Sequence, residues 1–264
     1  MTSWKTETYM TRTSWDLMPG SLKTPLIIAH RGAVEYAPEN SLDAFSIAYE
    51  KKADGIELDV RLSKDGIAVV LHDRVVDRTT NGRGPVGSFT LEQLKTLNAG
   101  SWYRPECEHV KIPTLADVFD TVPKDFLIVV ELKVRGWGIR PLVAAVIETV
   151  HDYDRWESTL ISSFNPVSLF ALRLMEPRLK RGYIWCAKHP FPISDRWLSP
   201  MAQPHWMNPD LETFTPKMLT HFHNQGKPVL AWDLDSGKDL TFLSSIGLDA
   251  VVTDRLSELV QQKC

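Results

Sequence analysis

The chain has 264 residues, of which 43% are hydrophobic, and a formal net charge of −3. This length is enough to bury one large core, and a single α/β barrel typically runs to about 250 residues. A clustered basic excess is typical of general nucleic-acid binders, so the slightly negative charge argues against a nucleic-acid partner.

The cellular location is predicted from the cysteines and from the lack of long apolar segments typical of signal peptides and membrane spans. Cys107, Cys186 and Cys264 are far apart, which favours reduced thiols over a disulfide framework. Residues 1–24 form a polar extension without the continuous apolar core of a signal peptide. No run approaches the roughly 20 apolar residues of a membrane span. We therefore predict a cytoplasmic protein without stable membrane insertion; the sequence does not indicate its oligomeric state.

From residue 25 to 264, apolar runs alternate with helix-like segments in what we take as a single domain. The predicted strands are 26–30, 55–61, 127–133, 159–164, 181–186, 205–208, 228–233 and 250–253. The predicted helices are 42–51, 115–121, 139–151, 166–175, 215–225 and 237–245. Several of the strands are nearly continuous in hydrophobicity, as strands buried on both faces are. The alternation predicts an α/β fold, a closed (β/α)8 TIM barrel rather than an open doubly wound sheet.

Two long segments interrupt this rhythm. Residues 62–113, after the second strand, hold an extra strand, a glycine-rich turn at 81–85 and a short helix near 91–97. Ordered insertions of this length tend to be functional. A second loop, 187–204, carries Phe191 and Trp197 and is either a surface cover over the barrel rim or a lid that touches a bound ligand.

Three acidic residues occupy strand positions that packing alone does not explain. Glu57 and Asp59 lie two apart in the second strand, so both point to the same face, and Glu131 ends the third. Carboxylate oxygens are the ligands of hard cations, so we predict one divalent cation, Mg²⁺ or Ca²⁺. The alternative is a structural ion-pair network of these acids with Arg31, Lys133 or Arg61.

Two histidines and two basic residues also lie at the ends of apolar runs. His30 and Arg31 end the first strand, His72 follows the run 68–71, and Lys133 faces the same side as Glu131. An imidazole both accepts and donates a proton near neutral pH, so His30 and His72 are predicted as a general acid/base pair. Arg31 and Lys133 suit phosphate oxygens, although Lys133 could instead form an ion pair with a neighbouring acid.

Five further residues are weaker candidates. Glu39 and Asn40 orient either the acidic, histidine and basic residues just named or the substrate hydroxyls. Alternatively, they cap the next helix. Phe164 and Trp232 either wall a pocket or belong to the core. His205, at the start of a strand, is considered as a residue that reaches the pocket.

The order of the motifs resembles the glycerophosphodiester phosphodiesterase family. The matching segments are HRG (30–32), PENS (38–41), DGIELDV (54–60), LHD (71–73), DRTTNGRG (77–84) and ELK (131–133). Weaker similarity continues through 162–165, 231–232 and 251–254, so the resemblance covers nearly the whole chain from about residue 25. A single short motif would mean little, but the ordered set at these spacings is a strong signal.

The resemblance implies metal-dependent hydrolysis of small glycerophosphodiesters to glycerol 3-phosphate and an alcohol such as choline or ethanolamine. The nearest alternative enzyme is a phospholipase D-type barrel that acts on lysophospholipids or sphingomyelin. An alternative of another class is a non-catalytic barrel that binds phosphodiesters. The sequence does not choose the preferred alcohol, the physiological metal or the roles of the two histidines. Nor does it show whether water or a substrate hydroxyl is the nucleophile.

Overall fold

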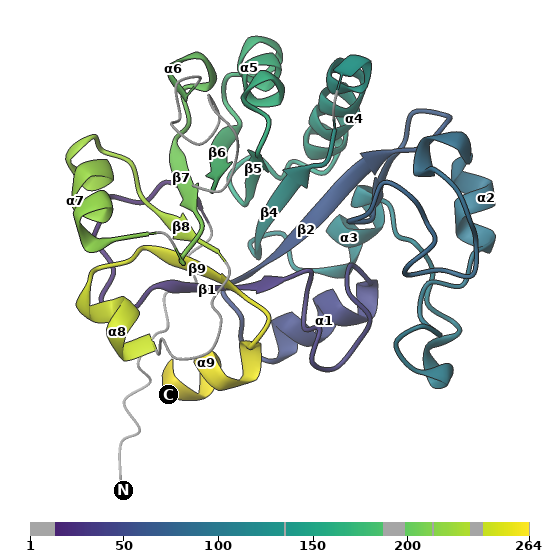
Figure 1. Cartoon of the computed structure of the whole chain (residues 1–264), viewed down its shortest axis with the longest axis horizontal. Helices are drawn as coiled ribbons and strands as arrows, with labels where there is room; N and C mark the ends of the chain where they lie inside the picture. Colours follow the sequence, from purple (N-terminus) through teal and green to yellow (C-terminus); the bar gives the residue numbers. More distant parts are fainter. Residues whose placement is uncertain (1–13, 135, 187–198, 213, 233–239, 264) are drawn as a thin grey trace, which may run out of the picture.

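Eight parallel strands form a nearly closed barrel (Figure 1). This computed structural model describes residues 14–134, 136–186, 199–212, 214–232 and 240–263. The barrel strands are β1 (Leu26–His30), β2 (Gly55–Leu62), β4 (Leu127–Leu132), β5 (Thr159–Ser163), β6 (Lys180–Trp185), β7 (Trp206–Pro209), β8 (Leu230–Ala231) and β9 (Ala250–Thr253). They pair in the order β7-β6-β5-β4-β2-β1-β9-β8, and single parallel bridges join β7 to β8. The predicted (β/α)8 barrel is confirmed.

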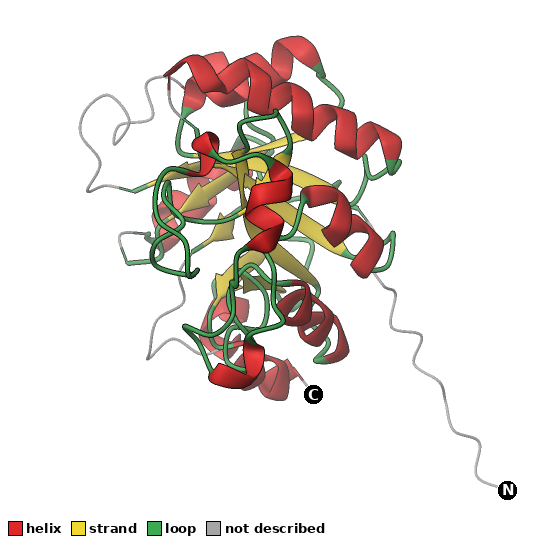
Figure 2. Ribbon diagram, turned by 90° about the vertical axis from the view of Figure 1, so that its right-hand side faces the viewer, coloured by secondary structure: helices red, strands yellow, loops and turns green. Residues whose placement is uncertain are grey.

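Helices surround the ring of strands (Figures 1 and 2). They are α1 (Leu42–Glu50), α3 (Leu115–Thr121), α4 (Ile139–Asp152), α5 (Pro166–Met175), α6 (Ser199–Ala202), α7 (Pro216–Asn224), α8 (Leu240–Ser245) and α9 (Leu256–Lys263). Ser41 and Thr114 cap α1 and α3 with their side chains, as N-cap residues do. The sequence analysis did not anticipate α6 and α9. The predicted loop residues Phe191 and Trp197 and the predicted helix start at 237–239 lie outside the described residues.

No helix in the described part of the chain is both long enough and apolar enough to cross a membrane.

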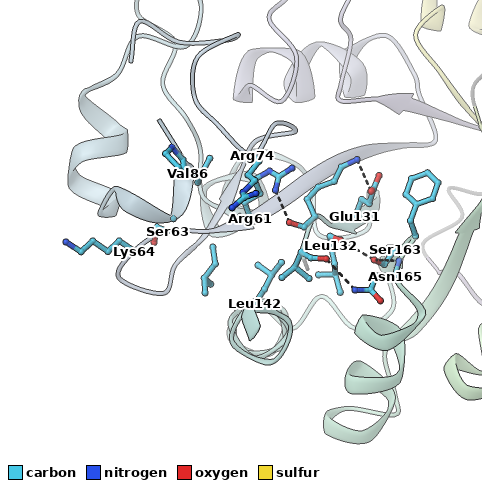
Figure 3. A pocket seen from close by; sticks show the side chains of 17 residues that line it. Arg61, Ser63, Lys64, Arg74, Val86, Glu131, Leu132, Leu142, Ser163 and Asn165 are labelled. Atoms are coloured by element: carbon cyan, nitrogen blue, oxygen red, sulfur yellow. Dashed lines mark hydrogen bonds and ion pairs between the residues drawn. The ribbon is translucent and has the colours of Figure 1, made fainter. Parts of the chain in front are cut away.

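The insertion after β2 is a small layer with its own core. Strand β3 (Ala68–Val70) pairs antiparallel with β2, and α2 (Leu91–Thr96) and two short 3₁₀ helices, η1 (Val86–Ser88) and η2 (Pro105–Cys107), follow. Val69, Val76 and Leu94 pack together inside it. Because the β2–β3 hairpin extends the carboxyl end of β2, the insertion lies beside that end of the barrel. A groove separates part of it from the ends of β4 and β5 (Figure 3).

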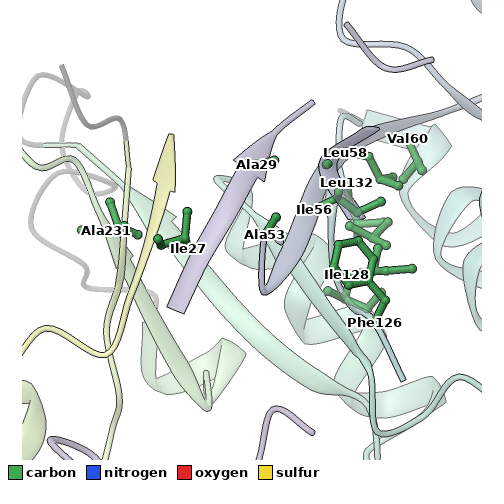
Figure 4. Close-up of a cluster of buried hydrophobic side chains, with 14 of the residues drawn as sticks. Ile27, Ala29, Ala53, Ile56, Leu58, Val60, Phe126, Ile128, Leu132 and Ala231 are labelled. Atoms are coloured by element: carbon green, nitrogen blue, oxygen red, sulfur yellow. The ribbon is translucent and has the colours of Figure 1, made fainter. Parts of the chain in front are cut away.

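Side chains alternate between the inside of the barrel and its helical shell. Ile28 and Val129 point inward and belong to the inner cluster. Ile27, Ile56 and Ile128 point outward and pack in the larger cluster between strands and helices (Figure 4). This period of two follows from strand geometry. The inward positions near the carboxyl ends of β1, β2 and β4 are therefore the ones that carry the polar residues.

Trp15 fills the amino-terminal end of the barrel. Its side chain is 1% exposed and packs edge-on against Trp206 at a ring distance of 5.1 Å. Its indole nitrogen donates to the carbonyl of Ser158 at 3.0 Å, and the Trp206 indole nitrogen donates to the Trp15 carbonyl at 3.0 Å. Part of the polar N-terminal extension thus seals the end of the barrel opposite to the insertion.

Candidate active site

Three carboxylates converge at the carboxyl ends of β2 and β4. Asp59 and Glu131 are direct partners in the parallel register of these strands, and Glu57 lies on the same face as Asp59. One oxygen from each of the three residues lies within 4.8 Å of the others, and all three side chains are buried. The parallel pairing of β2 and β4 thus brings the three predicted acidic residues together.

Two cations face this cluster. Lys133 Nζ lies 2.8 Å from Glu131 Oε1 and 3.2 Å from Asp59 Oδ1, and Arg31 Nε lies 3.5 Å from Asp59 Oδ2. Burial works against ionisation of Asp59, but Lys133 and Arg31 outweigh it and lower its pKa. Burial and then the Asp59 charge raise the pKa of Glu57 to about 8. The two cations therefore do not neutralise all three acids.

The carboxylates fit a hard divalent cation. Asn40 Nδ2 donates to Asp59 Oδ2 at 2.8 Å and orients that carboxylate. The other oxygen, Asp59 Oδ1, is buried; Lys133 Nζ lies 3.2 Å from it as an ion pair, but no described residue donates a hydrogen bond to it. Buried carboxylate oxygens of this kind are suitable ligands for Mg²⁺ or Ca²⁺. A structural ion-pair network accounts less well for the set, because Lys133 and Arg31 contact Asp59 and Glu131, whereas Glu57 faces the imidazole of His30 at the longer distance of 3.9 Å.

Both predicted histidines line one cavity of about 200 Å³ beside the acids. His30 Nδ1 lies 2.9 Å from Asp254 Oδ1, and His72 Nδ1 lies 2.6 Å from Asp73 Oδ1. A carboxylate beside Nδ1 favours the tautomer that carries its proton on Nδ1. In the neutral imidazole the lone pair is then on Nε2, on the opposite side of the ring. Burial lowers the pKa of His72, which keeps its imidazole neutral over more of the physiological range.

A chain of ion pairs connects the two sides of the site through the insertion. Arg78 Nε donates to Asp73 Oδ2 at 2.6 Å, and its two terminal nitrogens donate to Glu39 at 2.8 and 2.7 Å. Glu39 in turn accepts from Arg31 at 3.0 Å. The His72 side of the site is thereby tied to the Arg31 side.

Asp73, Arg78 and Asp254 were missed by the sequence analysis as functional residues. Each belongs to a motif that had been noted, within 71–73, 77–84 and 251–254. The signal was therefore present, but only the fold shows which charged groups these side chains contact.

Two residues of the site have left-handed backbones. Arg31 and Asn40 have φ angles of 55° and 56°, and the Asn40 amide donates to the Arg31 carbonyl at 2.9 Å. Gly32, between them in sequence, has φ 89°, and a Cβ there would lie 2.7 Å from the Ala44 Cβ. Left-handed non-glycine residues cost about 1–3 kcal/mol each and cluster at functional sites. In this backbone conformation both the Arg31 and the Asn40 side chains contact Asp59.

Aromatic side chains form one wall of the cavity. Phe164 and Trp232 both line it and pack edge-on at a ring distance of 5.4 Å. The Trp232 indole nitrogen donates to the carbonyl of Asn208 at 3.0 Å, which fixes the ring. The structure therefore brings both predicted aromatics to the site.

His205 is the predicted site residue that the structure does not bring to the others. It precedes β7, at the end of that strand opposite to the carboxylates, and its Nδ1 accepts from the Arg181 amide at 3.1 Å. In a parallel barrel the chain enters each strand at the amino-terminal end, whereas the site lies where strands end. The expectation that His205 reaches the pocket is corrected on this ground.

Comparison with known proteins identifies the family. The sequence model of the Glycerophosphoryl diester phosphodiesterase family matches residues 30–258. The chain belongs to this family.

Relatives of the family extend over nearly the whole chain. A glycerophosphodiester phosphodiesterase of Caldanaerobacter subterraneus is 38% identical over 239 residues, which are 89% of this chain and 96% of the relative. One from Bacillus altitudinis is 31% identical over 86% of this chain and 94% of the relative. A solved phosphodiesterase of Oleispira antarctica, in complex with the product sn-glycerol-3-phosphate, is 30% identical with a TM-score of 0.81. It covers 90% of this chain and 96% of its own.

Proposed function

We propose that this member of the glycerophosphodiester phosphodiesterase family hydrolyses glycerophosphodiesters to glycerol 3-phosphate and an alcohol. The observation that carries the proposal is the pairing of His30 and His72 in one cavity beside three buried carboxylates. The glycerol 3-phosphate in the Oleispira antarctica structure supports a small phosphate ester as the ligand.

The carboxylates of Glu57, Asp59 and Glu131 would hold one divalent cation, Mg²⁺ or Ca²⁺. When bound, such an ion supplies positive charge that offsets the charge developing on phosphate oxygens. Arg31 and Lys133 bind the same oxygens as fixed cations. Glu39 and Asn40 orient Arg31 and Asp59 through the hydrogen bonds described above.

The two histidines balance the protons of the reaction. One imidazole accepts the proton of the nucleophile, water or a glycerol hydroxyl, as its oxygen forms a bond to phosphorus, and the other donates a proton to the oxygen of the departing alcohol. The bond between phosphorus and the alcohol oxygen breaks, and one water is consumed overall, whether it attacks directly or opens a cyclic phosphate of the glycerol. Asp73 and Asp254 keep each imidazole oriented through its Nδ1.

The test compares three substrates in parallel with and without a chelator. Glycerophosphocholine and glycerophosphoethanolamine should be cleaved, lysophosphatidylcholine much more slowly, and excess chelator should abolish activity until Mg²⁺ or Ca²⁺ is restored. Full activity in chelator refutes the metal assignment. Preference for the lysophospholipid favours the phospholipase alternative, and failure to cleave any of the three favours the non-catalytic one.

Location and partners are proposed on sequence grounds. We place the protein in the cytoplasm because its cysteines are isolated from one another in the sequence, with a small-molecule substrate as its partner. Fractionation of cells that express the tagged protein tests the location.

A further inference from the structure

A groove of about 1090 Å³ continues outward from the catalytic cavity. Its walls are the end of β2, the loop after β3, η1, the end of β4, the start of α4 and the end of β5. The groove and the cavity of the histidines share three lining residues, Glu131, Lys133 and Phe164. A group attached to a phosphate in the cavity therefore has a direct path into the groove.

One wall of the groove carries positive charge. Figure 3 shows the guanidinium groups of Arg61 and Arg74 next to each other, and the two charges are close enough to act on one another. Arg61 donates to the carbonyls of His72 at 2.9 and 2.5 Å and of Lys133 at 3.0 Å. These hydrogen-bond partners are neutral carbonyls. Asp59, Asp73 and Glu131 are near enough to act on the Arg61 charge, but among the described residues none of them forms an ion pair with it.

The remaining charges of the groove reinforce this excess. Arg74 and Lys64 are exposed, and neither has an ion pair within the part of the chain that the structure describes. Asp65, next to Lys64, instead accepts from Ser63 and from the amide of Leu91. Glu131, the one carboxylate among the described lining residues, belongs to the cluster of three acids and is paired with Lys133 at 2.8 Å.

We infer that this groove binds the alcohol part of the substrate and that the preferred alcohol carries its own negative charge, such as a second phosphate. The inference rests on the proposed function, because the groove is assigned relative to the reacting phosphate. Arg61, Arg74 and Lys64 form no ion pair with a carboxylate in the described part of the chain, so they complement a phosphorylated alcohol and repel the ammonium groups of choline and ethanolamine. An acyl chain would use the aliphatic side chains Leu62 and Leu142 but would leave the cations without a partner.

The test uses one alcohol with and without a charge. We expect kcat/KM for glycerophosphoinositol 4-phosphate to exceed that for glycerophosphoinositol by about ten-fold, since two solvent-exposed ion pairs together amount to about this factor. Glycerophosphocholine should be the poorest of the three. The preference should shrink as the salt concentration rises, because exposed charges are screened.

Charge reversal locates the effect. Arg74→Glu, alone and with Lys64→Glu, should abolish the preference for the phosphorylated inositol. Both side chains are exposed, so thermal melting should match that of the parent protein. The matched control is Lys217→Glu on α7, an exposed position outside the groove, and it should retain the preference.

The outcomes separate this inference from the proposed function. Equal kcat/KM for the three diesters, or a preference that survives Arg74→Glu, overturns the groove assignment and leaves the hydrolase proposal intact. If none of the three diesters is cleaved, the proposed function fails and the inference fails with it.

Discussion

His205 gives a quantitative prediction about stability at low pH. Burial and then the neighbouring Arg181 cation lower the pKa of its imidazole to about 4, from an ordinary value of 6.5. Because the unfolded chain binds the proton more readily, the free energy of unfolding decreases as the pH falls from about 6.5 to about 4. At about 1.36 kcal/mol per pKa unit the loss is at most about 3 kcal/mol. Solvent screening of the part-exposed ring reduces this to about 1–2 kcal/mol.

The assay is denaturant unfolding at several pH values between about 7 and about 4.5. In His205→Asn the side-chain oxygen can replace Nδ1 as acceptor for the Arg181 amide. This variant should lose about 1–2 kcal/mol less than the parent protein over that range and should keep parental turnover at neutral pH. His151→Asn, at an exposed position of α4, is the control and should show the parental pH dependence. An unchanged slope in His205→Asn refutes the stability argument, and a large loss of turnover returns His205 to the active site.

Four other predictions concern the site and the barrel. His30→Ala and His72→Ala should each reduce turnover by about 10² to 10⁴ with much smaller effects on KM, and each should remove one limb of the pH–rate profile; near-normal turnover in either refutes its role. Asp73→Asn should lower kcat by at least about ten-fold while the thermal midpoint changes little, because it removes the carboxylate that orients His72; an unchanged kcat contradicts this. Glu57→Gln should abolish activation by Mg²⁺ or Ca²⁺, and calorimetric titration should show no metal binding. The metal-free variant should be no less stable than the parent protein, because the substitution removes a buried carboxyl group whose pKa is raised by its surroundings. Trp15→Ala should cost about 3–5 kcal/mol of unfolding free energy, measured by denaturant titration, without changing KM, as expected for a buried aromatic far from the site.

The barrel could be predicted from the sequence because its strands are buried on both faces. Continuous apolar runs marked β1 and β9 with their observed bounds, and the other strands differ mainly at their ends. The prediction was weakest for β8, expected over 228–233 but observed as Leu230–Ala231. Pro228 has no amide to donate, and β8 joins β7 only through single bridges. Trp15 left no periodic signal at all, because one aromatic in a polar segment reveals its packing only in three dimensions.

The site could be predicted only where strand geometry determines it. Residues on one face of neighbouring strands, such as Glu57 and Glu131, must meet once the register is formed, so a sequence pattern was sufficient. Arg78 is different, because it comes from a loop of the insertion and contacts Glu39, which is 39 positions away in the sequence. No local periodicity encodes a contact of that kind.

The insertion accordingly contributes residues both to the candidate active site and to the groove. Through Arg78 it holds Asp73, and so His72, in a fixed orientation. Through Arg74 it supplies charge to the groove that we assign to the alcohol. These two side chains have different partners, since Arg78 is saturated by carboxylates whereas Arg74 has none among the described residues. Substitutions at Arg74 can therefore change which alcohol is accepted while the carboxylates on β2 and β4 remain as they are, which separates substrate preference from the chemistry at the phosphate.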